Sequence, residues 1–276
     1  MQAPDKVQIG REKIIADQLA MLPGFENQHP LINPGQGAGL LSSLYELQQA
    51  LEIESGCTSV NFLSPGIDPG LFSIIAMIKA WHLQHSKSAR SEFVVIGDAE
   101  PFEFVARQIE FDLLMPPRAI TSVDRPWARL NCGDNTAGVF LFPPAGANIS
   151  IADVRWIADR VHYCGGLIVA DSGICQLIKR AGIDSEAIVD LYLLDLNQLF
   201  GTTAVSAASD CFALAAGEQL SPLLPVPRLV LEDSALRWSG DDEYPLSVGR
   251  TGTFGANKFA LLSLAIELQL RSEQSQ

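Results

Sequence analysis

The sequence predicts an α/β protein, in which helices cover both faces of a mostly parallel sheet. Of its 276 residues, 47% are hydrophobic, which is enough to build a large core. Short apolar runs alternate with longer segments of helical periodicity, and this alternation is typical of parallel sheets. The runs are apolar at every position, as expected for strands that are buried on both faces. The predicted strands are 93–96, 138–142, 167–170, 191–194 and 211–214.

The predicted helices share a repeat of apolar residues at spacings of three and four. The first contains Leu40, Leu44, Leu47 and Leu51 on one face. The third is followed by Gly165 and Gly166, which are typical of a helix C-terminus. The predicted helices are 36–54, 71–84, 151–163 and 257–271.

The segment 220–249 differs from the rest, with four prolines and an acidic patch at 241–243. This composition predicts an irregular arm that crosses the surface. The expected organisation is an N-terminal arm (1–35), a major domain (36–219), and an arm with a closing helix that packs on the same domain (220–276).

Charge and composition exclude several classes of protein. The formal net charge of −13 and the absence of a Lys/Arg cluster argue against nucleic acid as a partner. No signal-peptide pattern or apolar run of ~18 residues is present, so we expect a cytoplasmic protein without a membrane partner. The five cysteines are scattered without a CxxC motif, which favours buried, reduced thiols.

Polar residues that directly follow the predicted strands are the candidate site residues, because ligands bind at the carboxyl ends of parallel strands. Asp171 has two equally weighted interpretations: it binds a cationic group of a ligand, or it caps the next helix. His82 and His85 lack further metal ligands nearby and are interpreted as surface histidines, so no metal site is predicted.

Several segments, in order, resemble one known family. Segment 21–30 is similar to its "MPEFANLHP" stretch, 44–49 to "IYELQQ", 161–167 to "VHEAGGL", 223–227 to "FLPVP" and 247–250 to "SIGR". The family is the P-protein of the glycine cleavage system, a glycine decarboxylase that depends on pyridoxal phosphate (PLP). The resemblance is to its C-terminal half, or separate subunit 2, and runs from about residue 21 to 268. It implies the major domain of PLP fold type I, with the small C-terminal domain missing.

The departures from the family pattern fall on its chemistry. The family's Schiff-base lysine lies in "LNLHKTF", where this chain has Gln198, preceded by Asn197 at the family's histidine. An amide has no nucleophilic amine and so does not form an internal aldimine. Glu100 replaces the histidine that stacks on the cofactor ring, and Asp68 lies in the phosphate-binding loop. Asp171 is the retained cofactor-contact position.

The resemblance and its departures together predict a degenerate glycine decarboxylase-like pseudoenzyme that acts as a scaffold or regulatory subunit. It would form a homodimer, or a heterodimer with a catalytic PLP-dependent homologue, and no cofactor is expected. The alternatives are a component of a glycine decarboxylase complex, or a repurposed crevice that holds PLP or another small ligand without a covalent bond. In the repurposed crevice, Asp171 and Arg250 would bind the ligand, and the degenerate positions Asn197, Gln198 and Glu100 would supply polar contacts.

Overall fold

A computed structural model of the chain describes residues 15–16, 18–19, 34–63, 66–85, 90–97, 101–103, 105, 112–114, 127, 130–144, 147–201, 211–249 and 258–273. Glu100 and Arg250 lie outside this set, as do residues 21–30. Each helix in the described part of the chain is too short or too polar to cross a lipid bilayer.

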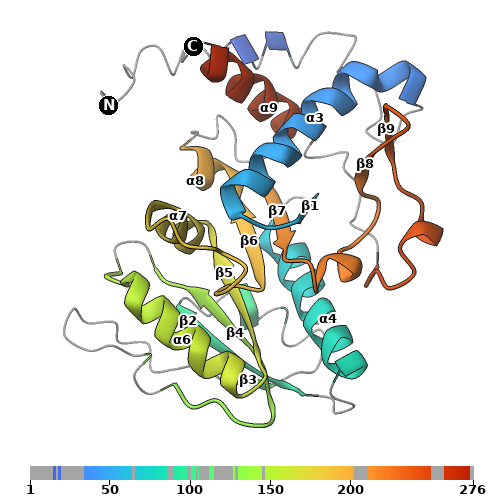
Figure 1. The fold of residues 1–276 in the computed structure, drawn as a ribbon. Helices are drawn as coiled ribbons and strands as arrows, with labels where there is room; N and C mark the ends of the chain where they lie inside the picture. Colours follow the sequence, from blue (N-terminus) through green and yellow to red (C-terminus); the bar gives the residue numbers. More distant parts are fainter. Residues whose placement is uncertain are drawn as a thin grey trace.

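A seven-stranded sheet forms the centre of the molecule (Figure 1). Its order is β1-β7-β6-β5-β4-β2-β3, with every neighbouring pair parallel except the two that involve β7. The predicted, mostly parallel α/β fold is therefore confirmed. The strands are β1 (Ser59–Phe62), β2 (Glu92–Gly97), β3 (Asp112–Leu114), β4 (Thr136–Phe142), β5 (Leu167–Asp171), β6 (Leu191–Asp195) and β7 (Phe212–Ala216).

Helices cover both faces of the sheet, and α4 lies on the face opposite α6 and α7 (Figure 1). Successive residues of β4 contribute to two separate cores: Val139 and Leu141 pack with α3, α6, α7 and α9, whereas Phe140 between them packs with α4. This two-sided burial explains why the predicted strand segments are apolar at every position. The helices are α3 (Pro34–Ser55), α4 (Ile67–His85), α6 (Ile151–Tyr163), α7 (Ser172–Arg180), α8 (Leu196–Phe200) and α9 (Lys258–Glu273).

Helix α6 has the predicted bounds because both ends carry local signals. Ser150 caps its N-terminus: the Asp153 backbone N–H donates to Oγ, and the Asp153 carboxylate accepts from the Ser150 N–H. Gly165 follows the helix with a φ of +74°, a conformation that glycine adopts without strain.

The prediction for His82 was wrong. His82 is 1% exposed, and its Nε2 lies 2.8 Å from the carbonyl oxygen of Ala137 in β4. His85, in contrast, is exposed and bonds to the Trp81 carbonyl of its own helix. The buried histidine therefore holds α4 against the sheet.

The predicted irregular arm contains a regular hairpin. β8 (Leu229–Glu232) pairs with β9 (Ala235–Trp238) across a turn at Asp233 and Ser234, both of which have positive φ. The proline-rich stretch before the hairpin is irregular, as predicted. Arg228 stabilises this stretch through hydrogen bonds to its backbone. The buried guanidinium donates to the carbonyls of Pro222, Leu224 and Pro225.

Candidate ligand site at the carboxyl edge of the sheet

Two neighbouring strands end in carboxylates at one edge of the sheet. Asp171 ends β5 and Asp195 ends β6, and these strands pair in parallel. Helix α4 begins at the same edge, because β1 is antiparallel to β7 and hence parallel to β6. The edge where ligands bind in such folds thus gathers the predicted strand-end residues that the structure describes.

Asp171 caps helix α7. Its Oδ1 accepts a hydrogen bond of 2.9 Å from the backbone N–H of Ile174. Burial raises the pKa of this carboxyl group to about 6, although hydrogen bonds from backbone N–H groups act in the opposite direction. The capping interpretation from the sequence is confirmed, and ligand binding by Asp171 stays a prediction.

Asp195 makes the same kind of cap at the next turn. Its Oδ1 accepts from the backbone N–H groups of Asn197 (2.9 Å) and Gln198 (3.2 Å). The hydroxyl of Ser172 donates to the Asp195 carbonyl at 3.0 Å, which joins the two strand-to-helix turns. A second link comes from Gln176, whose Nε2 donates to the carbonyls of Leu199 (2.9 Å) and Gln198 (3.2 Å). These bonds form a frame around position 198.

Gly173 brings the Asp171 carboxyl and the Gln198 amide to one place. A Cβ built on Gly173 would lie 3.3 Å from Asp171 Oδ1 and 3.7 Å from Gln198 Nε2. A Cβ this close to Asp171 Oδ1 would be crowded, so glycine lets both polar groups approach the same backbone position. The two sequence-predicted residues Asp171 and Gln198 are therefore together.

The described residues do not fit covalently bound PLP. The lysines whose side chains the structure describes are Lys79 and Lys179. Lys79 lies twelve residues after the start of α4, and Lys179 lies seven residues after the start of α7. At 1.5 Å per residue, both lie about 10–18 Å along the helix axis from the carboxyl edge. Lys179 is also held by Glu54, with Nζ 2.5 Å from Oε1. Within the described residues, no amine lies at position 198 or beside it.

The N-terminus of α4 carries a negative charge. A helix N-terminus attracts a phosphate through its free N–H groups and positive dipole end. Here Asp68 lies in the first turn of α4, where its negative charge opposes a second anion. The local charge therefore disfavours the phosphate group of PLP.

We expect Asp171→Asn to stabilise the protein at pH 8 by about 1–2 kcal/mol. Burial raises the pKa of Asp171 to about 6, so the folded state carries a desolvated charge above that pH. As the pH falls from 6 towards 4, the folded state protonates Asp171 first and the penalty disappears. Asparagine caps helices as well as aspartate does, so the cap is kept. Urea unfolding at pH 8 and pH 4.5 measures the difference, and a variant that is less stable than wild type at pH 8 would contradict the argument.

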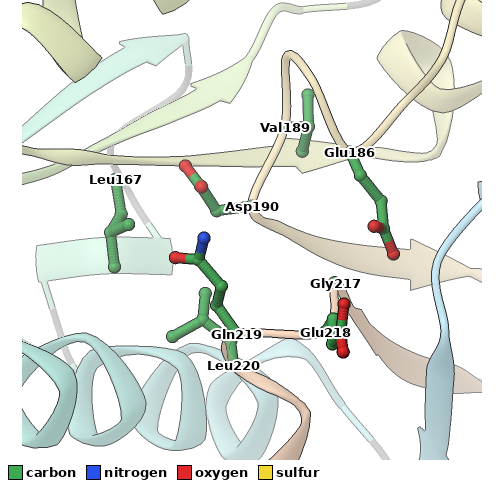
Figure 2. A pocket seen from close by; sticks show the side chains of 8 residues that line it. All are labelled: Leu167, Glu186, Val189, Asp190, Gly217, Glu218, Gln219 and Leu220. Carbon is green, nitrogen blue, oxygen red and sulfur yellow. The ribbon is translucent and has the colours of Figure 1, made fainter.

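A cavity at the opposite edge of the sheet was not predicted from the sequence (Figure 2). It measures about 150 Å³ and lies at the amino ends of β5 and β6, beside the turn that follows β7. Its lining is Leu167, Glu186, Val189, Asp190, Gly217, Glu218, Gln219 and Leu220. Within the described part of the chain, no group of three or more His, Cys, Asp or Glu side chains is arranged to hold a metal ion.

Asp190 in this cavity joins helix α6 to the sheet. Its Oδ2 accepts from the Ile168 backbone N–H at 2.7 Å and lies 2.9 Å from His162 Nε2. The hydrogen bond to Asp190 raises the pKa of His162, which partial burial opposes.

The His162–Asp190 pair makes stability depend on pH. The folded-state pKa of His162 lies above the unfolded value, so its contribution is complete below about pH 6.5 and is lost as the pH rises through the raised pKa. We expect wild type to lose about 0.5–1 kcal/mol more than His162→Gln between pH 5.5 and pH 8.5, since the pair is partly exposed. Chemical denaturation of both proteins at the two pH values measures this. Parallel pH dependence of wild type and variant would contradict it.

Comparison with known proteins places these observations in context. No family model matches the chain. The chain is 29% identical over 246 residues to a probable glycine dehydrogenase (decarboxylating) subunit 2 of Legionella pneumophila, a match that covers 88% of this chain and 51% of the relative. It is also 29% identical over 262 residues to the protein of the same name from Coxiella burnetii, covering 94% of this chain and 53% of the relative. The chain spans about half the length of the curated relatives it matches.

Solved structures give the same fold. A glycine decarboxylase (P-protein) of the glycine cleavage system, in inhibitor-bound form, superimposes with a TM-score of 0.67 at 17% identity, covering 93% of this chain and 59% of that chain. An ornithine aminotransferase from Toxoplasma gondii superimposes with a TM-score of 0.54 at 13% identity, covering 96% and 59%. The predicted resemblance to glycine decarboxylase subunit 2 is confirmed, and the fold is that of PLP fold type I enzymes.

Proposed function

We propose that this chain is a glycine decarboxylase-like pseudoenzyme, which acts as a non-catalytic partner subunit of a PLP-dependent homologue or of a second copy of itself. The observation that carries the proposal is Gln198. Its backbone is held at the carboxyl edge by the Asp195 cap, and its side chain is an amide where the family has the Schiff-base lysine. An amide nitrogen is not nucleophilic, so this position does not link to an aldehyde.

The surrounding charges support the same conclusion. Asp68 in the first turn of α4 disfavours a phosphate group, and burial raises the pKa of the Asp171 carboxyl group to about 6, so its charge is less stable here than in water. Covalent cofactor chemistry needs an amine and a place for the phosphate, and both are altered here. The core residues beneath the site are nevertheless fully buried, including Val169, Leu193 and Leu194.

A partner role agrees with the relatives named as subunit 2 of a glycine dehydrogenase. That name describes a protein that works beside another subunit. A chain that keeps the fold while its chemical positions change is what we expect of a non-catalytic neighbour in such an assembly.

A PLP titration of the purified protein, followed by borohydride reduction and intact mass, tests the proposal. We expect wild type to yield no reduced adduct. A stoichiometric adduct on any lysine of wild type would overturn the pseudoenzyme conclusion. Co-purification with a PLP-dependent homologue, or a stable homodimer in light scattering, would support the partner role. A monomer that binds no homologue would contradict it.

Gln198→Lys is the matched variant for this titration. It places an amine on the hydrogen-bonded frame formed by Ser172, Gln176 and Asp195. We expect the variant to gain a reducible PLP adduct at position 198, located by peptide mapping, in contrast to wild type. A variant without an adduct would contradict the assignment of position 198 as the decisive loss.

A second candidate function is a repurposed binding site for a small ligand that is held without a covalent bond. The observation that favours it is the proximity of the Asp171 carboxyl and the Gln198 amide, which lie together beside Gly173. Calorimetric titration with PLP distinguishes the two functions. Saturable binding that Gly173→Leu abolishes, without an adduct after borohydride, would favour the binding protein, whereas no heat of binding would favour the partner role.

A further inference from the structure

Two cysteines lie close together at the amino edge of the sheet, away from the candidate ligand site. Cys132 lies four residues before β4, and Cys164 lies three residues before β5. The Cys164 thiol donates to the carbonyl oxygen of Cys132, with a sulfur-to-oxygen distance of 3.2 Å. Since two bonds of ~1.5 and ~1.2 Å connect a carbonyl oxygen to its Cα, Cys164 Sγ lies within about 6 Å of the Cys132 Cα.

The loops that carry both cysteines are held in place by arginines. Nη1 of Arg90 donates to the Cys164 carbonyl at 2.7 Å and to the Thr136 carbonyl at 2.9 Å. Nε of Arg160 donates to the Leu130 carbonyl at 2.8 Å. The two loops thus stay in place, and the thiols are near enough that, in addition to burial, the charge of Cys164 raises the pKa of Cys132.

Exposure of Cys164 gives an oxidant access to the pair. Cys164 is partly exposed and Cys132 is 9% exposed, whereas Cys57 and Cys175 are 4% and 2% exposed. Burial raises the pKa of Cys57 and of Cys175 to about 12, so these thiols are shielded from solvent and stay protonated at neutral pH. The family segment "VHEAGGL" has alanine where this chain has Cys164, so the pair is a feature of this sequence rather than of the resemblance.

We propose that Cys132 and Cys164 form a reversible disulfide when the protein meets a low-molecular-weight disulfide such as oxidised glutathione. The Cys164 thiolate attacks one sulfur of the oxidant, the sulfur–sulfur bond breaks, and one glutathione leaves as its thiol. The Cys132 thiolate then attacks Cys164 Sγ and releases the second glutathione. Two protein thiols are oxidised, and one glutathione disulfide is reduced to two thiols.

The closing step is the slower one at neutral pH. Burial raises the pKa of Cys132 to about 11, with the nearby Arg160 acting in the opposite direction. Because the thiolate is the attacking form, bridge formation accelerates between pH 7 and pH 9. The completed bridge closes a loop that contains β4 and α6, and we expect it to raise the melting temperature by about 5–10 °C.

The test incubates the full chain with oxidised glutathione under native conditions, followed by alkylation and peptide mapping without reduction. We expect a loss of about 2 Da per chain, a Cys132–Cys164 peptide, and reversal by dithiothreitol. The variants Cys132→Ser and Cys164→Ser should not form the bridge. The control variant Cys211→Ser, which changes a buried thiol just before β7, should still form it. Glutathione that stays attached to Cys164 without closing would overturn the proposal. So would equal oxidation of Cys57 and Cys175, or no reaction by pH 9.

Discussion

Gly97→Ala is expected to destabilise the protein by about 4 kcal/mol or to prevent folding altogether. Gly97 ends β2 with a φ of +145°, a conformation that residues with a Cβ rarely adopt. A Cβ added there would lie 1.7 Å from the carbonyl oxygen of Phe142 and 2.5 Å from its carbonyl carbon. Both clashing atoms belong to the backbone of β4, so relief requires the paired strands to separate at the carboxyl edge.

Urea unfolding measures this effect, with Gly133→Ala as the control. A Cβ on Gly133 meets nothing within 4 Å, and its expected effect is within about 0.5 kcal/mol. We expect Gly97→Ala to disturb the candidate site as well, because β2 and β4 end at the same edge of the sheet as Asp171. A Gly97→Ala protein as stable as wild type would show that β2 and β4 do not approach this closely.

Arg228→Met is expected to destabilise the protein by about 3–5 kcal/mol. The residue is 6% exposed, and its guanidinium lies 3.9 Å from the centre of the Tyr244 ring. Burial lowers its pKa to about 10, which still leaves it charged at neutral pH. Methionine fills the apolar part of the space but leaves the carbonyls of Pro222, Leu224 and Pro225 without this donor.

The matched control is Arg237→Met in the exposed hairpin. Arg237 forms ion pairs with Glu232 and Glu243 at the surface, where water replaces lost contacts, so we expect a far smaller change. Thermal and urea unfolding of the two variants under the same conditions measure the contrast. Similar losses for both would contradict the importance of the buried guanidinium. Proteolysis within residues 220–228 of the Arg228 variant would report the loosened segment directly.

Long periodic segments were predictable, and short or context-dependent ones were not. The five predicted strands and four predicted helices all occur, with ends shifted by a few residues. β1 has four residues with a polar Asn61 among them, too few for a clear pattern. The antiparallel direction of β7 depends on its neighbours, which an isolated apolar run does not encode.

Two missed features did leave a signal in the sequence. His82 follows Leu71, Ile74, Ile75 and Ile78 at helical spacing, which places it on their buried face. The pair Asp233-Ser234 between two short segments with apolar residues is a signal of a hairpin turn. The prolines nearby favoured the interpretation as an irregular arm instead.

The candidate site was predictable only where it follows a general rule. Strand ends of a parallel sheet pointed to Asp171 and Gln198, and the structure places them together at Gly173. The proximity of the two groups depends on how α7 and α8 begin, which local sequence does not fix. The acidic cavity at the amino edge has no comparable rule, since it is built from a strand start and two turns.

The frame around position 198 consists of side chains other than that of residue 198 itself. Ser172, Gln176 and Asp195 hold the turn through backbone atoms, whichever side chain position 198 bears. A change of chemistry here therefore leaves the architecture intact. A protein engineer can therefore place new reactive groups on this turn and keep the hydrogen bonds that hold it.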